Sequence, residues 1–257
     1  MIQIKELKKS INDRVILDGI NLDVKDGQTL CIIGKSGCGK SVLLKNIVGL
    51  MQPDSGSILV DGLNVPALNK KELFNLRKTI GYVFQGAALF DSLNIYENVV
   101  LRLYEHNERN KEVLETEAKR VLSSVGLLPD ISEINTTYFE NEWINLSNKM
   151  PSELSGGMKK RVGVARALVG TPKYILYDEP TTGLDPVTSE QIDKLIFNLA
   201  NNLQITSIVI THDMFSVYKL NCDIAMLNNG KIHFFGSSSD FNTSSDPAIR
   251  EFLERYS

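Results

Sequence analysis

The stretch "GKSGCGKSVLLKNIVGL", residues 34–50, follows the apolar run "TLCII" of residues 29–33. A buried strand, a glycine-rich turn and a helix in this order form a phosphate-binding loop, and the spacing fits its pattern of glycine, four residues, glycine, lysine and serine. The N–H groups of such a turn and of the following helix N-terminus converge on a phosphate. The stretch therefore predicts a nucleotide site at the end of a buried strand.

The side chains of the loop predict how the nucleotide is held. Lys40 can reach the β- and γ-phosphate oxygens, and the Ser41 hydroxyl can bind Mg²⁺. Gly37 and Gly39 let the backbone approach the phosphates closely. The expected nucleotide contacts in this segment are Gly34, Lys35, Ser36, Gly37, Cys38, Gly39, Lys40, Ser41 and Val42.

Composition describes an ordinary globular protein. The chain has 257 residues, 42% hydrophobic and 23% charged, and a formal net charge of -3 gives no general attraction to nucleic acid. One large domain with a subdomain is expected. The longest apolar runs are too short to span a bilayer, and the N-terminus lacks the features of a signal peptide, so cytoplasmic residence is expected. Cys31, Cys38 and Cys222 fit reduced thiols better than a disulfide framework or a zinc site.

Short apolar runs alternate with helical patterns along most of the chain, which favours an α/β sheet with parallel central strands. Turn signals at Asp26-Gly27, Asp61-Gly62 and Asn229-Gly230 indicate hairpins, and so an antiparallel portion near the N-terminus. The expected strands are residues 16–24, 29–33, 80–84, 174–177, 205–210 and 223–227, and the expected helices include residues 40–50 and 247–256.

Residues 97–170 have a mainly helical pattern and predict a separate helical subdomain. One charged helix carries a stripe that is expected to be buried, formed by Val113, Ala118, Val121, Leu122 and Val125. The apolar residues within 129–150 are not spaced with a clear helical or strand periodicity. The segment is expected to form an ordered excursion, because Tyr138, Phe139, Trp143 and Ile144 need burial.

Two acids follow the apolar strand "YILY". Asp178 and Glu179 stand at its C-terminal end, where α/β sheets place their ligand chemistry. Asp178 is expected to hold Mg²⁺ through a water. Glu179 is turned to the other side and can orient or deprotonate the attacking water.

Two further polar side chains stand at strand ends. His212 follows residues 205–210, where it could donate to the γ-phosphate or hold the water and Glu179 in line. Gln85 ends the strand "IGYVF" and could touch Mg²⁺ or water. His106 and His233 lack such a context and are expected to be structural. The apolar side chains after Gln85 fit either packing within the subdomain or a docking surface; they are Ala87, Ala88, Leu89, Phe90, Leu93 and Ile95.

A second anion site is predicted far from the first. In "LSGGMKKRVGVARAL", residues 154–168, Ser155, Gly156 and Gly157 precede a helix whose N-terminus favours an anion. The basic side chains that follow are interpreted as a solvated helix face rather than a nucleic-acid surface, because no aromatic residues interleave them. They are Lys159, Lys160, Arg161 and Arg166.

Taken together, these motifs resemble those of the ATP-binding subunits of ABC transporters, in order and spacing, over nearly the whole chain. The resemblance implies a P-loop NTPase of the ABC ATPase fold, with a RecA-like core, an antiparallel β subdomain and a helical subdomain at about residues 86–170, all in one ATP-binding domain spanning residues 1–257. It implies ATP hydrolysis with Mg²⁺ and a head-to-tail homodimer. In such a dimer, Ser155, Gly156 and Gly157 of one copy meet the ATP of the other, and Asp185 helps to align the two sites.

The sequence looks most like the ATPases of MCE-type lipid transporters, on "VFQGAALFDSLNIYENV", "MPSELSGGMKKRVGVARAL" and "DPAIREFLE". That resemblance implies a membrane-embedded permease dimer, an MCE-domain lipid-binding partner and phospholipid or a similar hydrophobic cargo, with the ATPase on the cytoplasmic face of the inner membrane. Three features depart from the family pattern. Lys9 and Ile11 stand where the family has an adenine-stacking aromatic, and Gly183 stands where alanine is common. The excursion at residues 129–150 is longer than expected for the MCE-type group.

Other functions are weighed against this one. The same engine could serve an importer of amino acids, metals or lipoproteins. A monomeric P-loop kinase or GTPase leaves residues 154–157 unexplained and would need a guanine-reading motif that the sequence lacks. An ABC protein of DNA repair or translation usually carries two nucleotide domains or a long coiled-coil insertion, and this chain shows neither.

Overall fold

The computed structural model describes residues 1–256, with side chains up to residue 255. Its central sheet orders the strands β10-β9-β3-β8-β7-β6, all parallel except the edge strand β10. These strands are β3 (Thr29–Ile33), β6 (Ile80–Val83), β7 (Tyr174–Asp178), β8 (Thr206–Ile210), β9 (Asp223–Asn228) and β10 (Lys231–Ser237). The expected parallel α/β core is confirmed, and β3 has the predicted bounds.

Side-chain alternation along the central strands builds a core on each face of this sheet. In β3, Leu30 and Ile32 point to one core cluster, while Cys31 and Ile33 point to the other. Strand β7 is buried over its whole length, which explains its continuous apolar sequence. Of the two acids predicted at its end, Asp178 is the last residue of this buried strand and Glu179 follows it.

An antiparallel sheet covers the N-terminal side, with strand order β2-β1-β4-β5. Its strands are β1 (Ile2–Ile11), β2 (Arg14–Val24), β4 (Ser55–Val60) and β5 (Leu63–Asn64). The hairpins predicted at Asp61-Gly62 and Asn229-Gly230 join β4 to β5 and β9 to β10. The hairpin predicted at Asp26-Gly27 is wrong, because this turn passes the chain from β2 in one sheet to β3 in the other.

Helices pack against the sheets and continue the chain between strands. They include α1 (Lys40–Ile47), α2 (Lys70–Arg77), α7 (Pro186–Leu203), α8 (Met214–Leu220), α9 (Ser238–Thr243) and α10 (Pro247–Tyr256), with a 3-10 turn at Val65–Ala67. Helix α10 has the predicted bounds. Helix α1 ends earlier than predicted, because Gly49 takes a positive φ of 66° and Arg77 donates to the carbonyl oxygens of Val48 and Gly49.

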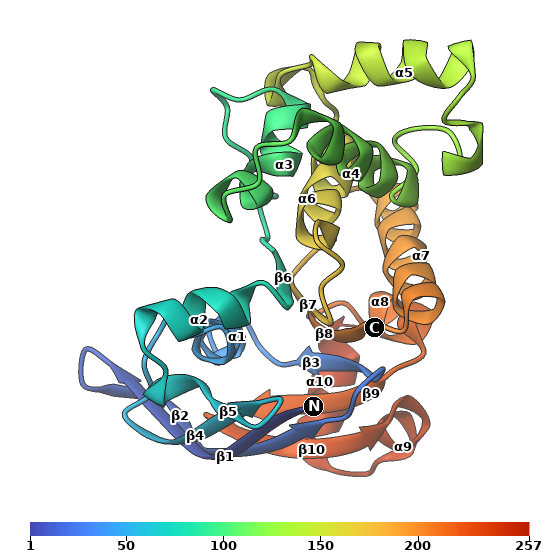
Figure 1. Ribbon diagram of the computed structural model, residues 1–257. Helices are drawn as coiled ribbons and strands as arrows, with labels where there is room; N and C mark the ends of the chain where they lie inside the picture. The colour runs from blue at the N-terminus through green and yellow to red at the C-terminus, as the bar shows by residue number, and fades with distance from the viewer. Residues whose placement is uncertain (257) are drawn as a thin grey trace.

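Helices α3 to α6 gather at one end of the molecule, away from the antiparallel sheet (Figure 1). They are α3 (Ile95–Glu105), α4 (Lys111–Ser124), α5 (Thr137–Ser147) and α6 (Gly156–Leu168), with 3-10 turns at Ile131–Glu133 and Pro151–Glu153. This placement agrees with a helical subdomain, whose boundaries near residues 86 and 170 stay a prediction.

The excursion at residues 129–150 contains α5, a helix that the sequence analysis did not predict. Phe139 and Trp143 are buried as expected, whereas Tyr138 and Ile144 are exposed. In α4, Val113 is likewise exposed and the neighbouring Leu114 is buried in its place. The expected burial of Tyr138, Ile144 and Val113 is therefore wrong, because these side chains lie on the outward sides of their helices.

The three cysteines are free thiols, as expected. Cys31 and Cys222 are buried, while Cys38 in the phosphate-binding loop is half-buried. The two remaining predicted structural residues also have local partners. His106 caps α3 and its ring lies 4.2 Å from that of Phe74, and His233 lies 3.0 Å from a carboxylate oxygen of Asp246.

Candidate active site

The phosphate-binding loop joins β3 to α1, as predicted, and two of its glycines are required by close packing. A Cβ at Gly34 would lie 2.4 Å from the carbonyl oxygen of Leu227. Gly39, with φ 109°, is the residue before α1, and a Cβ there would lie 3.0 Å from side-chain atoms of Ile16 and Leu17. The loop is thus pressed against β2 and β9, which fixes where its N–H groups point.

Lys40 is folded into this loop. Its side chain is buried, and Nζ donates to the carbonyl oxygens of Gly34 at 2.8 Å and Lys35 at 3.2 Å. Lys35 itself turns outward and pairs with Glu251 of α10. The ammonium of Lys40 therefore lies within the turn whose N–H groups can bind phosphate.

Ser41 and Asp178 meet as the sequence predicts. The Ser41 hydroxyl donates to Oδ1 of Asp178 at 2.8 Å, and the Tyr82 hydroxyl donates to Oδ2 at 3.0 Å. Asp178 is 9% exposed, so both carboxylate oxygens have a hydroxyl partner in a largely buried position. A hydroxyl and a carboxylate are oxygen donors of the kind that Mg²⁺ prefers, so these residues fit a magnesium ion.

Glu179 follows the last residue of β7 and turns to the opposite side from Asp178. Its backbone has a φ of 49°, which is uncommon for a residue with a side chain, and its N–H donates to the carbonyl oxygen of Ile210. Backbone of this kind costs about 1–3 kcal/mol and persists where the surroundings hold it. Here the strand ends of β7 and β8 aim the Glu179 carboxylate into the site.

Three side chains surround that carboxylate. Gln85 Nε2 donates to Oε2 at 3.2 Å, Thr182 Oγ1 donates to the same oxygen at 3.0 Å, and His212 Nδ1 lies 3.5 Å from Oε1. The structure thus brings together the predicted Gln85, Glu179 and His212, and adds Thr182, which the sequence analysis did not single out. A carboxylate held in this way can orient a water molecule or accept its proton.

Lys160 and Arg166 of α6 do not belong to the solvated helix face that the sequence analysis expected. Lys160 is 6% exposed and its Nζ donates to the main-chain oxygen of Gln85. Arg166 donates to the carbonyl oxygens of Ala87 and Ala88, each at 2.7 Å. These cations hold the loop after β6 because its carbonyl groups have no strand partner. Burial lowers the pKa of Lys160, against the opposite effect of the nearby Glu179 carboxylate.

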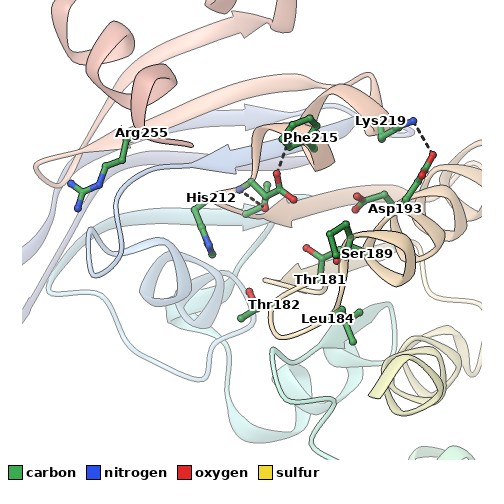
Figure 2. A pocket seen from close by; sticks show the side chains of 13 residues that line it. Thr181, Thr182, Leu184, Ser189, Asp193, His212, Phe215, Lys219 and Arg255 are labelled. Carbon is green, nitrogen blue, oxygen red and sulfur yellow. Dashed lines mark hydrogen bonds and ion pairs between the residues drawn. The ribbon is translucent and has the colours of Figure 1, made fainter. Parts of the chain in front are cut away.

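His212 lies on the wall of a pocket of about 750 Å³ between α7 and α8. Figure 2 shows His212 beside Thr182, with Lys219 at the opposite end. Asp193 also lines this pocket but is only 3% exposed. Burial raises its pKa to about 6, although the Ser216 hydroxyl donates to its Oδ2 at 2.8 Å.

The second predicted anion site is a separate recess of about 370 Å³. Ser155 is the residue before α6, and its Oγ accepts a hydrogen bond from the N–H of Met158. Gly157 must lack a side chain, because a Cβ there would lie 2.7 Å from Cγ2 of Thr188. Asp185 begins α7 and accepts from the N–H and hydroxyl of Thr188. The helix N-termini of α6 and α7 therefore open on one surface.

A groove of about 450 Å³ runs beside β6, between the central sheet and the helices. The sequence allowed two roles for the apolar residues after Gln85, packing within the subdomain or a docking surface, and the structure shows some of them buried and others exposed. Ala87 and Ile95 are buried in the core, whereas Phe90 is 53% exposed and lines the groove with Phe84. Packing therefore accounts for part of the segment, and an exposed apolar wall remains.

The sequence of the chain is similar to those of known ATP-binding proteins, which agrees with the phosphate-binding loop described above. A sequence profile described as ABC transporter matches residues 17–182. The chain is 36% identical over 252 residues to a probable ribonucleotide transport ATP-binding protein, mkl, of Mycobacterium leprae, and spans 68% of its length. It is 38% identical over 255 residues to the methionine import ATP-binding protein MetN of Clostridium tetani, and spans 75% of that protein.

Two further similarities bear on the site. The chain is 35% identical over 254 residues to the intermembrane phospholipid transport system ATP-binding protein MlaF of Escherichia coli K12, covering 99% of this chain and 88% of that one. A solved structure, the dimeric ATP-binding cassette MJ0796 in a post-hydrolysis state bound to ADP and Pi, is 30% identical with a TM-score of 0.78. It covers 92% of this chain, and this chain covers 98% of it.

Proposed function

The chain belongs to the ABC transporter family as an ATP-hydrolysing subunit that uses ATP and Mg²⁺, and we propose that two copies pair head to tail to drive lipid transport through a membrane permease. The observation that carries the pairing is the separation of the two anion sites. The phosphate-binding loop joins β3 to α1, while the recess at Ser155 and Gly157 lies between α6 and α7. Neither can enclose a nucleotide alone.

A second copy completes both sites at once. In the pair, the recess of one chain closes over the ATP held by the loop of the other, with Asp185 at the junction. The dimer bound to ADP and Pi in the related cassette supports this arrangement. Two such sites per pair follow from the two-fold symmetry of a homodimer.

Within each site, Glu179 orients the attacking water. Gln85, Thr182 and His212 hold its carboxylate, and His212 can also donate toward the γ-phosphate. Lys40 neutralises charge on the phosphates. Ser41, Asp178 and Gln85 are the residues that would hold Mg²⁺, which would supply positive charge next to the transferred phosphoryl group. The remaining loop residues bind the triphosphate through their N–H groups.

The permease partner is expected at the groove beside β6. Within residues 1–256, no helix is both long and apolar enough to cross a bilayer, so transport requires other chains. The groove offers the exposed rings of Phe84 and Phe90 next to the loop that carries Gln85. We place the dimer on the cytoplasmic face of the inner membrane, with a permease dimer and an MCE-domain lipid-binding protein.

Phospholipid or a similar hydrophobic molecule is the proposed cargo. The similarity to MlaF, which extends over 99% of this chain, supports it. A second candidate is an importer of amino acids, because the identity to MetN is 38%. Cargo need not touch the ATPase, so the two candidates share the same site and differ only in the permease.

The dimer is tested with Glu179→Gln, which keeps the shape of the side chain and removes its basicity. We expect normal MgATP binding, turnover reduced by at least about 100-fold, the scale that general-base catalysis contributes, and a stable dimer by light scattering. Unaltered turnover would remove Glu179 from its role. A variant that stays strictly monomeric with saturating MgATP, alone and with its permease, would contradict the pairing.

The cargo is tested by purifying the chain from its native membrane with its bound partners. Co-purification with a permease and an MCE-domain protein, together with ATP-dependent transfer of labelled phospholipid between vesicles, is the expected result. Transport of methionine without lipid transfer would instead favour the importer.

A further inference from the structure

Tyr82 is the second hydrogen-bond donor to Asp178, and the motifs of the sequence do not include it. It lies on β6, where it is opposite Leu176 of β7, so Asp178 follows two residues further along the neighbouring strand. The Tyr82 hydroxyl donates to Oδ2 at 3.0 Å, while Ser41 donates to Oδ1 at 2.8 Å. One hydroxyl comes from the start of helix α1 and the other from strand β6, and each binds a different oxygen of the carboxylate.

This contact is shielded from solvent. Asp178 is 9% exposed and Tyr82 is half-buried. A hydrogen bond to an ionised carboxylate is shorter and about twice as strong as one between neutral groups.

Orientation matters for the ion that this carboxylate would hold. Mg²⁺ demands near-ideal octahedral geometry and is bound by few protein oxygens. Partners that hydrogen-bond a metal-binding carboxylate fix its direction, and losing such a partner typically costs about 10–100-fold in metal affinity. We propose that Tyr82 is a positioning residue that sets the metal affinity of the site by holding Asp178. This rests on the proposed role of Asp178.

The ring of Tyr82 also reaches the surface of the groove. It lines the groove together with Phe84, and the two ring centroids are 4.5 Å apart. The Phe84 ring therefore packs against the ring that carries the hydroxyl on Asp178. The groove and the carboxylate are joined through a single side chain.

The test compares Tyr82→Phe with Tyr177→Phe in the full-length chain. Both changes remove one phenol oxygen from adjacent strands, but Tyr177 is fully buried in the core cluster on the other face of the sheet. Mn²⁺ binding in the presence of ATP is measured from the electron paramagnetic resonance of the free ion. ATP affinity is measured separately in EDTA.

We expect Tyr82→Phe to weaken Mn²⁺ binding by about 10-fold and to leave the metal-free ATP affinity within about twofold. Tyr177→Phe should change neither. Phe84→Ala should weaken Mn²⁺ binding in the same direction by a smaller factor, because it loosens the ring of Tyr82 and keeps its hydroxyl. Thermal unfolding of each variant checks that the fold is retained.

Asp178→Asn separates this inference from the proposed site. If Asp178→Asn loses metal affinity and Tyr82→Phe does not, Asp178 keeps its role and the inference about Tyr82 is overturned. If Asp178→Asn itself retains full affinity, the proposed metal site fails and the inference falls with it. An equal loss of ATP affinity in EDTA for Tyr82→Phe would also overturn the inference, because the hydroxyl would then act on the whole site.

Discussion

Lys160 donates a hydrogen bond to the main-chain oxygen of Gln85, and this joins α6 to the loop beside the Glu179 carboxylate. The side chain of the same glutamine donates to Glu179. Gln85 is thus held at its backbone by α6 and at its side chain by Glu179, the residue after β7. Since α6 begins at Gly156 in the recess predicted to bind a second anion, one helix contacts both that recess and the loop that carries Gln85.

Replacing Lys160 by methionine should slow turnover without abolishing nucleotide binding. The unbranched apolar side chain fills the same space but leaves the Gln85 carbonyl without its donor, which lets the loop drift from Glu179. We expect kcat to fall about tenfold, equivalent to about 1.4 kcal/mol, with ATP affinity within about twofold. Steady-state ATPase kinetics and fluorescent-nucleotide binding measure the two quantities.

Lys159→Met is the matched control for that experiment, because it removes the same charge at the next position of α6. It should leave kcat unchanged, and Lys160→Arg should restore part of the loss. An equal effect at both lysines would mean that the charge of the helix matters and the contact to Gln85 does not.

Lys40→Ala should abolish tight nucleotide binding. The ammonium lies inside the loop, bonded to the carbonyl oxygens of Gly34 and Lys35, so its removal takes away the cation nearest to where the phosphates would bind. We expect ATP affinity to fall by at least about 100-fold, or roughly 3 kcal/mol. Calorimetric titration with ATP measures it, and affinity within tenfold of the wild type would show that the phosphate site is elsewhere.

Much of this site could be predicted because its chemistry is local in sequence. The strand, turn and helix around Lys40 are adjacent in the chain. Glu179 and His212 each come shortly after a run of apolar residues, and that run is enough to predict a buried strand. Parallel strands then bring these ends to one edge of the sheet. The predicted strands and α10 follow from the same strong patterns.

The parts that could not be predicted depend on contacts between distant segments. A lysine in a basic run has the same sequence signature whether it faces water or a carbonyl group 75 residues away, as Lys160 does. Asp26-Gly27 has the composition of a hairpin turn, but pairing of β3 with β8 and β9 decides that it links two sheets. Only some of the apolar side chains of α5 are buried, so the spacing of its apolar residues does not show a clear helical periodicity.

The contact between Gly157 and Thr188 predicts an unusual rescue. Gly157→Ala places a methyl group 2.7 Å from Cγ2 of Thr188, which should displace the start of α6 from α7 and lower ATPase activity by about tenfold or more. Thr188→Ser removes that Cγ2 and keeps the hydroxyl that donates to Asp185. The double variant should regain activity to within about threefold of Thr188→Ser alone, because the two effects are coupled by one contact.

A double variant as inactive as Gly157→Ala would show a different requirement. The methyl group would then obstruct the approach of the partner's nucleotide, and relief of the contact with Thr188 would not help. Thermal unfolding of the same proteins distinguishes the cases, since the contact with Thr188 should lower stability only in Gly157→Ala.

Asp193 makes the stability of the chain depend on pH. Its pKa is raised from 3.8 to about 6: burial is the largest cause, Asp213 and Glu190 add to the rise, and Ser216 and Lys219 oppose it. The folded state therefore binds more protons than the unfolded state between these two values, so this group lowers the free energy of unfolding as pH increases through that range. Above it, the folded protein carries a poorly solvated carboxylate.

Asp193→Asn should therefore stabilise the protein at pH 7.5. The amide oxygen can still accept from Ser216, and no charge is buried. We expect a gain of about 1–2 kcal/mol, less than the full equivalent of the shift because the pocket is open to solvent, and a melting temperature higher by about 2–6 °C. The gain should shrink as the pH is lowered to 4.5. Glu190→Gln should give no such gain, because the partner Lys219 lowers the pKa of Glu190. Equal stability of Asp193→Asn and the wild type at pH 7.5, or a gap that stays constant down to pH 4.5, would contradict the assignment.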